Sequence, residues 1–170
     1  MASIGLFYGT DEGHTEDVSE RIQKLFPDGE VEIINIAEAS NEDFEEFEIL
    51  ILGTPTLENG GKQPDWEEFW PNLYSIDFSQ KVVALFGLGD QVGYGDYFLD
   101  SMGDLAEAVS GQGATVIGEW PIEGYDFGAS RALTASADHF VGLAIDEDTQ
   151  DDETDARCEA WVKQVQAALA

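Results

Sequence analysis

A short stretch near the start of the chain, Ile4-Gly5-Leu6-Phe7-Tyr8-Gly9-Thr10-Asp11-Glu12-Gly13-His14-Thr15, combines the patterns of a strand, a tight turn and a helix. Its apolar beginning predicts a buried strand from Ser3 to Tyr8, and the spacing of apolar residues from Thr15 to Phe26 predicts a helix. The turn between them is rich in glycine and hydroxyl groups. A turn of this kind places backbone N–H groups beside a helix N-terminus, where anions bind, most often phosphate.

The turn contains no lysine or arginine. A bound phosphate would therefore be held mainly by backbone and hydroxyl donors, and His14 could assist as an imidazolium. The alternatives are an exposed His14 with no such role and a turn with no ligand, because short glycine–threonine turns are common.

Apolar runs and helical patterns alternate along the rest of the chain. Continuous apolar runs such as Ile49-Leu50-Ile51-Leu52 predict strands that helices cover on both faces. Alternation of this kind predicts an α/β fold, a three-layer sandwich around a five-stranded parallel sheet with right-handed crossovers. The expected strands are Ser3–Tyr8, Val31–Ile36, Ile49–Gly53, Val82–Gly87 and Thr115–Gly118, and the expected helices are Thr15–Phe26, Asn41–Phe47, Pro64–Leu73, Tyr97–Ser110 (with Gly111 as its C-cap) and Asp155–Leu169.

The fifth strand is interrupted. Residues 119–139 are rich in glycine, serine and aromatic side chains, and Phe140–Ile145 then has the pattern of a strand again. A segment inserted into one edge strand explains this order, and Trp120, Tyr125 and Phe127 are expected to anchor it to the sheet. We therefore expect a single domain over residues 1–170, with residues 119–139 as an insertion in strand five.

The chain is strongly acidic, with 36 acidic and 7 basic residues and a net charge of −29. This charge disfavours nucleic acid and anionic membranes as partners and favours a protein with a basic face. Acid excess with few lysines also suits a protein adapted to high salt, and the two interpretations are compatible. The chain has one cysteine, Cys158, expected to be a small apolar helix residue, and it has neither a membrane-spanning run nor a signal pattern. We therefore expect a cytoplasmic protein.

Two more glycine-rich loops follow the third and fourth strands, where parallel sheets bind their ligands. They are Gly53–Gly61 and Gly87–Asp96. In the second loop, Tyr94 could stack on a flat ring and Asp90 could bind the ring edge, while Leu57 in the first loop could cover the other face. A phosphate turn combined with a sandwich for a flat ring predicts a phosphorylated planar cofactor.

At these stretches the sequence closely resembles the long-chain flavodoxins, which bind FMN and shuttle electrons, and the resemblance spans essentially the whole chain. It is carried by residues 5–10, 51–56, 84–94 and 140–146, of which 84–94 is the most specific. The resemblance implies a flavodoxin-like sheet of order 2-1-3-4-5. It also implies that residues 119–139 are the insertion that separates long-chain from short-chain members.

By this resemblance, Thr10–Thr15 would surround the FMN phosphate, the two later loops would hold the isoalloxazine ring, and Asp146 would lie near the ribityl chain. No catalytic residue and no metal ligand is expected. The expected cofactor-binding residues are Thr10, Asp11, Glu12, Gly13, His14, Thr15, Pro55, Thr56, Leu57, Glu58, Asn59, Gly60, Leu88, Gly89, Asp90, Tyr94, Tyr97 and Asp146.

Several positions depart from the pattern of the family, and one of them is His14, which stands where members often carry lysine. Glu12 stands where a hydroxyl residue is usual, and it brings a carboxylate close to the phosphate. Leu57 stands where many members carry tryptophan, so one aromatic ring rather than two would stack on the flavin. The peptide Glu58–Asn59 matches the one whose carbonyl turns toward the flavin in the family, and here it contains no glycine.

The resemblance implies a low-potential one-electron carrier rather than an enzyme. As a monomer, it would take electrons from a reductase of the ferredoxin/flavodoxin–NADP type and pass them to low-potential acceptor enzymes with basic docking faces. The alternatives are an FMN-dependent quinone or nitro reductase of the same fold, an FMN-free interaction module, and a phosphoreceiver domain. The last needs an aspartate at the end of the third strand, where Gly53 and Thr54 stand.

We expect the melting temperature to rise by at least about 4 °C, or roughly 1 kcal/mol, between dilute buffer and about 1 M salt. The reason is that the Debye length falls to about 3 Å at that salt concentration, which screens the repulsion among the carboxylates. Thermal unfolding followed by circular dichroism in both buffers measures the change. An unchanged melting temperature would contradict a destabilising effect of the charge.

Overall fold

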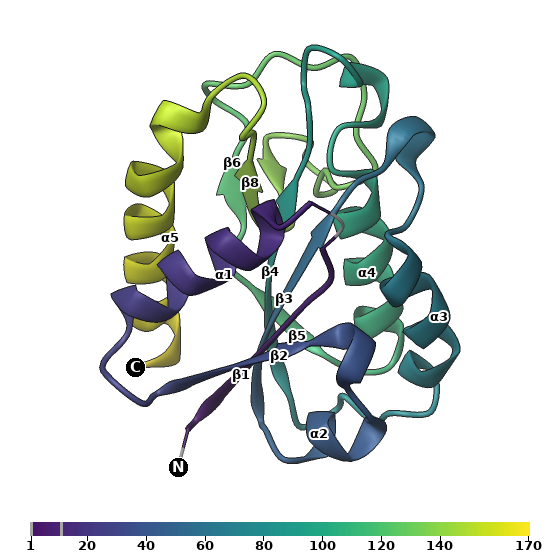
Figure 1. Ribbon diagram of the computed structural model, residues 1–170, viewed down its shortest axis with the longest axis vertical. Coiled ribbons are helices and arrows are strands. Elements are labelled where there is room, and N and C mark those ends of the chain that lie inside the picture. Colours follow the sequence, from purple (N-terminus) through teal and green to yellow (C-terminus); the bar gives the residue numbers. More distant parts are fainter. Residues whose placement is uncertain (1, 11) are drawn as a thin grey trace.

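The computed structural model describes residues 2–10 and 12–170, and it shows a twisted parallel sheet between two layers of helices (Figure 1). The order of the main strands is β2-β1-β3-β4-β5, as expected, and β8 pairs with β4 beyond the end of β5. The strands are β1 (Ile4–Tyr8), β2 (Val31–Asn35), β3 (Ile49–Pro55), β4 (Val82–Leu88), β5 (Thr115–Ile117), β6 (Trp120–Pro121), β7 (His139–Phe140) and β8 (Leu143–Ile145). The helices are α1 (His14–Leu25), α2 (Asn41–Glu45), α3 (Pro64–Leu73), α4 (Asp100–Gly111) and α5 (Thr154–Leu169), with 3-10 turns at Ile36–Glu38, Glu58–Gly60, Gly95–Tyr97 and Asp151–Glu153.

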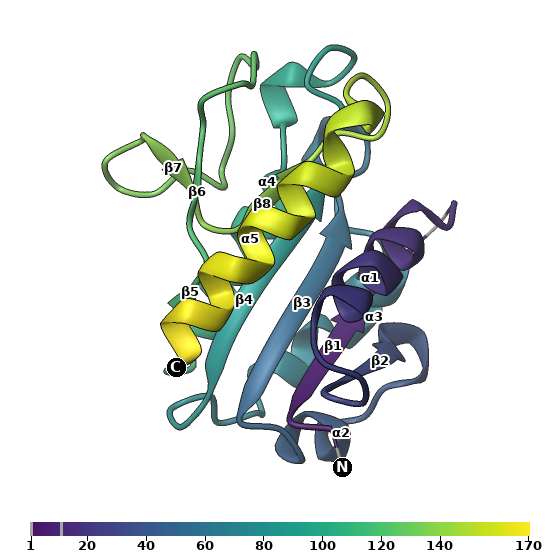
Figure 2. The ribbon, with the colours of Figure 1, turned by 90° about the vertical axis from the view of Figure 1, so that its left-hand side faces the viewer.

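The two faces of the sheet have separate apolar cores, because successive strand residues point to opposite sides. Ile4 and Leu6 of β1 pack with Val18 of α1 and Trp161 of α5. Phe7, the residue after Leu6, packs in the other core with residues of α2, α3 and α4. Figure 2 shows α1 and α5 side by side across the first face. The continuous apolar runs in the sequence thus correspond to strands covered on both sides.

The fifth position of the sheet is shared by two short strands. β5 pairs with the first part of β4, at Val82–Ala84, and β8 pairs with its last part, at Phe86–Leu88. The insertion between them contains the antiparallel pair β6–β7. This arrangement confirms an insertion in the last strand.

The expectation of one continuous strand over Phe140–Ile145 is wrong. Phe140 ends β7, and the chain then changes partner before β8 begins at Leu143. At the change, Gly142 passes so close to β4 that a Cβ atom there would lie 2.2 Å from the Leu85 carbonyl oxygen.

Aromatic side chains hold the insertion on the sheet, as the sequence predicts. Tyr125 and Phe127 both pack against Phe140, with ring centroids 5.4 and 5.3 Å apart. The Tyr125 hydroxyl donates to the Ala144 carbonyl, and the Trp120 indole N–H donates to the Tyr125 hydroxyl oxygen. The insertion is therefore packed against the last strand.

Helix α4 begins later than the predicted Tyr97. Residues 95–97 form a 3-10 turn, and Leu99 has a left-handed φ of 59°. The insertion accounts for the shift, since the Gly95 carbonyl accepts hydrogen bonds from the N–H groups of residues 128 and 129. Gly111 is the last residue of α4 and not its cap, whereas Gly113 has the left-handed φ of 101°. The other expected main elements agree to within about two residues at each end.

Replacing Gly142 with alanine should destabilise the fold by about 1–3 kcal/mol or more, because the new methyl group would overlap backbone atoms of β4. Gly111→Ala is the matched control. A Cβ atom at Gly111 meets nothing within 4 Å, and alanine in place of glycine stabilises a helix by up to about 1 kcal/mol. Urea unfolding of both variants tests the pair, and equal stabilities would contradict the close approach.

Candidate functional site

A hollow of about 330 Å³ lies at the carboxyl edge of the sheet, where the loops after β1, β3 and β4 meet the segment after β8. Its volume is within the range of small-molecule sites. The expected site residues that line it are Thr10, Glu12, His14, Thr15, Pro55, Thr56, Leu57, Leu88, Gly89, Asp90 and Tyr94. The structure therefore brings the three predicted loops together around one space.

The phosphate-type turn ends at the first residue of α1. Gly13 is in the left-handed region with φ of 89°, and no side chain among the described residues caps the helix, which leaves N–H groups of its first turn available to an anion. The Gly13 N–H donates to the Thr10 hydroxyl oxygen at 2.9 Å. Thr15 is buried, while Glu12 and His14 are exposed on the hollow.

Close packing at Gly9 fixes the position of this turn. A Cβ atom on Gly9 would lie 2.3 Å from the Gln63 amide oxygen, which accepts the N–H of Trp66 at the start of α3. The Trp66 indole N–H and the Gly9 N–H both donate to the Gly53 carbonyl, at 3.0 and 3.2 Å. The turn after β1 is therefore anchored to the end of β3 and the start of α3.

Leu57 and Tyr94 come from separate loops, after β3 and β4, and both line the hollow. Tyr94 is 44% exposed. Asp90 shapes the loop that carries Tyr94, because its Oδ1 accepts the N–H groups of Val92 and Gly93 at 3.0 and 2.7 Å. Its contact with a ring edge stays a prediction.

Asp146 lies beneath the loops and does not line the hollow. It is fully buried. Its carboxylate accepts the backbone N–H groups of Gln91, Asp148 and Thr149, the Gln91 side-chain amide and the Thr149 hydroxyl. It thereby ties the loop after β4 to the segment after β8.

Several other expected residues also lie outside the lining. Tyr97 lines a second, more open hollow of about 750 Å³ between the loop after β4 and the insertion. Gly13, Asn59 and Gly60 belong to the loops around the first hollow without lining it. Asp11 is outside the described residues, and so is the side chain of Glu58.

Glu147 and Asp148 also line the hollow, although they were not among the predicted site residues. Burial raises the pKa of Asp148, and the nearby carboxylates of Asp90, Asp146 and Glu12 raise it further, while His14 opposes the rise. The edge of the hollow is thus acidic, and none of its described lining residues is lysine or arginine. Both belong to the acidic run that directly follows Ile145 in the sequence, but it is the pairing of β8 with β4 that brings them to the hollow.

The loop after β3 is a tight turn with unusual backbone angles. The Leu57 N–H donates to the Gly61 carbonyl, and the Gly60 N–H donates to the Leu57 carbonyl, both at 3.0 Å. Asn59 and Gly60 have φ of 63° and 78°, in the left-handed region. Asparagine is among the residues that adopt this region most readily, so it can replace glycine at this position.

Cys158, Trp66 and Phe69 pack in the two apolar cores and lie outside the hollow. Cys158 is buried in the core beneath α5, and burial raises the pKa of its thiol to about 12. Trp66 and Phe69 are buried in the other core. Within residues 2–10 and 12–170, no three His, Cys, Asp or Glu side chains are grouped so that they could hold a metal ion. None of the helices described is both long enough and apolar enough to cross a membrane.

A family model described as flavodoxin matches residues 6–161. Flavodoxin 1 of Salmonella typhimurium is 49% identical over 169 residues, which cover 99% of this chain and 96% of that protein. A flavodoxin of Synechocystis sp. is 47% identical over 170 residues and covers 99% of each chain.

Among solved structures, that of a Fusobacterium nucleatum flavodoxin bound to flavin mononucleotide has a TM-score of 0.92. It is 30% identical and the match covers 99% of both chains. The full-length matches and the sheet with its interrupted last strand agree with one another. The chain therefore belongs to the flavodoxin family, among its long-chain members.

Proposed function

We propose that this flavodoxin holds FMN in the hollow of about 330 Å³ at the carboxyl edge of the sheet and carries single electrons at low potential. The cofactor and the electron-transfer role follow from family membership. The placement of FMN rests on one observation: the three predicted loops surround one space beside the start of α1. When bound, FMN supplies the redox chemistry by accepting and releasing electrons one at a time.

The phosphate end of the cofactor would lie at the start of α1. Backbone N–H groups there, with the hydroxyl groups of Thr10 and Thr15, supply donors to an anion without any lysine or arginine. The positive end of the α1 dipole acts at the same place. Glu12 opposes this attraction, since its carboxylate lies on the same hollow.

The flavin ring would lie between the loops that carry Leu57 and Tyr94. Tyr94 offers an aromatic face, and Leu57 offers an apolar contact that excludes water. Asp90 and Asp146 hold the loop that carries Tyr94 by hydrogen bonds to its backbone N–H groups, and Asp146 also holds the segment after β8, so this wall of the site is preorganised. Thr56 adds to this by accepting the Ser101 N–H at 3.2 Å, which joins the loop after β3 to α4.

The protein tunes the flavin chiefly through its charge. Full reduction at neutral pH leaves a negative ring, and the carboxylates at the hollow together with a net charge of −29 disfavour that added charge. The bound cofactor is therefore a strong reductant. The same charge would guide a reductase and acceptor enzymes with basic faces to the edge of the hollow. We propose that the carrier works as a monomer in the cytoplasm, and that its acidity also suits a high-salt environment.

An absorbance spectrum followed by stepwise reduction tests the function. The purified protein should be yellow, or become so on addition of FMN, and should accept electrons in two separate steps. Steady oxidation of NADPH by the protein alone would instead indicate a reductase of the same fold. A chain that stays colourless with added FMN would indicate an interaction module.

Glu12→Gln should tighten FMN binding by about fivefold at low salt, because a unit charge repelled at about 4 Å in water costs roughly 1 kcal/mol. The measurement is the quenching of FMN fluorescence on titration with the FMN-free protein. Glu20→Gln is the matched control, since Glu20 is an exposed residue of α1 that does not line the hollow. Equal affinities of the two variants would contradict a repulsive contact at Glu12.

The potential for addition of the second electron should rise with ionic strength, on the order of tens of millivolts between about 0.1 M and 1 M salt. A screened repulsion of about 1.4 kcal/mol corresponds to about 59 mV for one electron. Redox titration in both buffers measures the shift, with free FMN as the control. A potential that does not depend on salt would rule out tuning by the protein's charge.

A further inference from the structure

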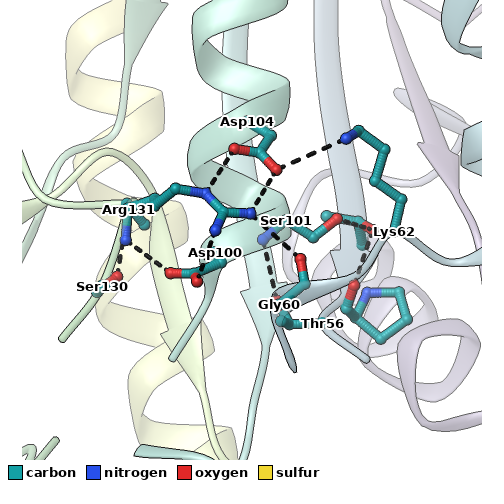
Figure 3. A network of polar contacts seen from close by, with 11 residues as sticks. Thr56, Gly60, Lys62, Asp100, Ser101, Asp104, Ser130 and Arg131 are labelled. Atoms are coloured by element: carbon teal, nitrogen blue, oxygen red, sulfur yellow. Dashed lines mark hydrogen bonds and ion pairs between the residues drawn. The ribbon is translucent and has the colours of Figure 1, made fainter. Parts of the chain in front are cut away.

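Arg131 of the insertion reaches the loop after β3, far from it in the sequence. One guanidinium nitrogen, Nη2, donates to the Gly60 carbonyl at 3.3 Å. Figure 3 shows this arginine between that loop and α4, at the centre of a network of hydrogen bonds and ion pairs. The insertion therefore has a direct polar contact with a loop of the proposed flavin site.

Two carboxylates of α4, one turn apart, fix the guanidinium in place. Asp104 accepts from Nε at 2.9 Å and from Nη2 at 2.8 Å, which is the bidentate geometry that arginine makes best. Asp100 lies 3.1 Å from Nη1 and is almost fully buried, and it also accepts the Arg131 backbone N–H at 2.7 Å. Burial raises the pKa of Asp100, and Arg131 opposes that rise. The guanidinium is planar and its N–H groups point in fixed directions. These contacts therefore also orient Nη2 toward the Gly60 carbonyl.

The backbone of Arg131 is fixed as well. A Cβ atom added to Gly103 of α4 would lie 2.3 Å from the Arg131 carbonyl oxygen, so the two backbones are in close contact. The next residue, Ala132, is fully buried. The hydrogen bond to Gly60 therefore starts from a rigid support.

The Gly60 backbone is held at both of its polar groups. Its N–H donates to the Leu57 carbonyl, and its carbonyl accepts from Arg131. The loop has two consecutive residues with positive φ, Asn59 and Gly60, and its first residue, Leu57, lines the hollow. A rearrangement of this loop that moves the Gly60 carbonyl has to break its hydrogen bond to Arg131.

Reduction of a flavin changes what a neighbouring backbone must offer. A bound flavin would present different hydrogen-bond donors and acceptors in its oxidised and reduced states, so one fixed loop conformation would not suit both states equally. A restraint on the loop shifts the midpoint potential of the flavin. The size of the shift is set by the difference between the free energies that the restraint adds to the oxidised and the reduced state. Arg131 holds the loop in the conformation seen in this structure, so any rearrangement of the loop on reduction has to overcome its hold.

We propose that Arg131 is a positioning residue for the flavin, which holds the loop Leu57–Gly61 through the Gly60 carbonyl and thereby makes the first one-electron reduction of bound FMN harder. The proposal rests on the proposed function, because it presumes that FMN occupies the hollow. Arg131 does not line that hollow and acts on the cofactor only through the loop.

The test compares Arg131→Gln and Arg131→Lys with the wild type. Lysine keeps the charge but cannot bind Asp104 in bidentate fashion while also donating to Gly60. In both variants we expect oxidised FMN to bind about tenfold more weakly and the first midpoint potential to rise. If affinity for the reduced state is unchanged, a tenfold loss corresponds to a rise of about 59 mV.

Lys163→Gln is the control for charge, since Lys163 is an exposed residue of α5 and its replacement removes one positive charge, as Arg131→Gln does. Loss of positive charge by itself disfavours an added electron and would lower the potential. A rise in both Arg131 variants and not in Lys163→Gln would support positioning. An unchanged potential in Arg131→Gln, or a fall equal to that in Lys163→Gln, would overturn the proposal.

Hydrogen exchange of the FMN-free full-length chain separates this proposal from the proposed function. The amides of residues 57–61 should exchange about fivefold faster in Arg131→Gln, because a hydrogen bond that restrains the loop is lost. Unchanged exchange would show that Arg131 does not hold the loop, whether or not the protein binds FMN. If exchange is faster in Arg131→Gln but the protein binds no FMN, the result would contradict the proposed function and not the contact between Arg131 and Gly60.

Discussion

The parallel pairing of β1, β3 and β4 is the constraint on which the rest of the structure depends. Tyr8 pairs with Gly53, and Gly53 pairs with Phe86, so the three strands reach the same edge of the sheet at the same level. The loops that follow these strands then surround one hollow. The pairing also requires glycine, because a Cβ atom on Gly53 would lie 2.1 Å from the Phe86 ring.

The electrostatics of the site combine a local attraction for anions with a repulsive field. The start of α1 offers N–H groups and the positive end of a helix dipole, and both act within about one turn. Glu12, Glu147 and Asp148 surround the same hollow, and the net charge of the chain is −29. Short-range donors can hold an anion in such a field because hydrogen bonds act at contact distance while the field is screened by salt. The same field disfavours negative charge on a reduced flavin, so one feature affects both binding and potential.

The sequence predicted the strand–turn–helix units and the loops of the candidate site well, because each depends on residues close together in the chain. Apolar runs predicted the buried strands, and the ends of those strands predicted the positions of the loops. The predictions that were wrong concern features that depend on residues far away in the chain. Helix α4 begins at Asp100 and not at Tyr97, because the N–H groups of residues 128 and 129 hold the Gly95 carbonyl. Glu147 and Asp148 were missed because their place at the hollow follows from the pairing of β8 with β4 beyond the insertion.

By itself, the sequence determined the fold class, the strand–turn–helix unit around Gly9–Thr15 and the family, because local periodicity and short motifs are properties of adjacent residues. Only the tertiary structure decided how the parts are joined. It made Asp146 a buried acceptor beneath the loops and brought Arg131 to Gly60, although 71 positions separate those two residues. Contacts of this length depend on how strands pair and how the insertion packs on α4, and no local pattern in the chain specifies them.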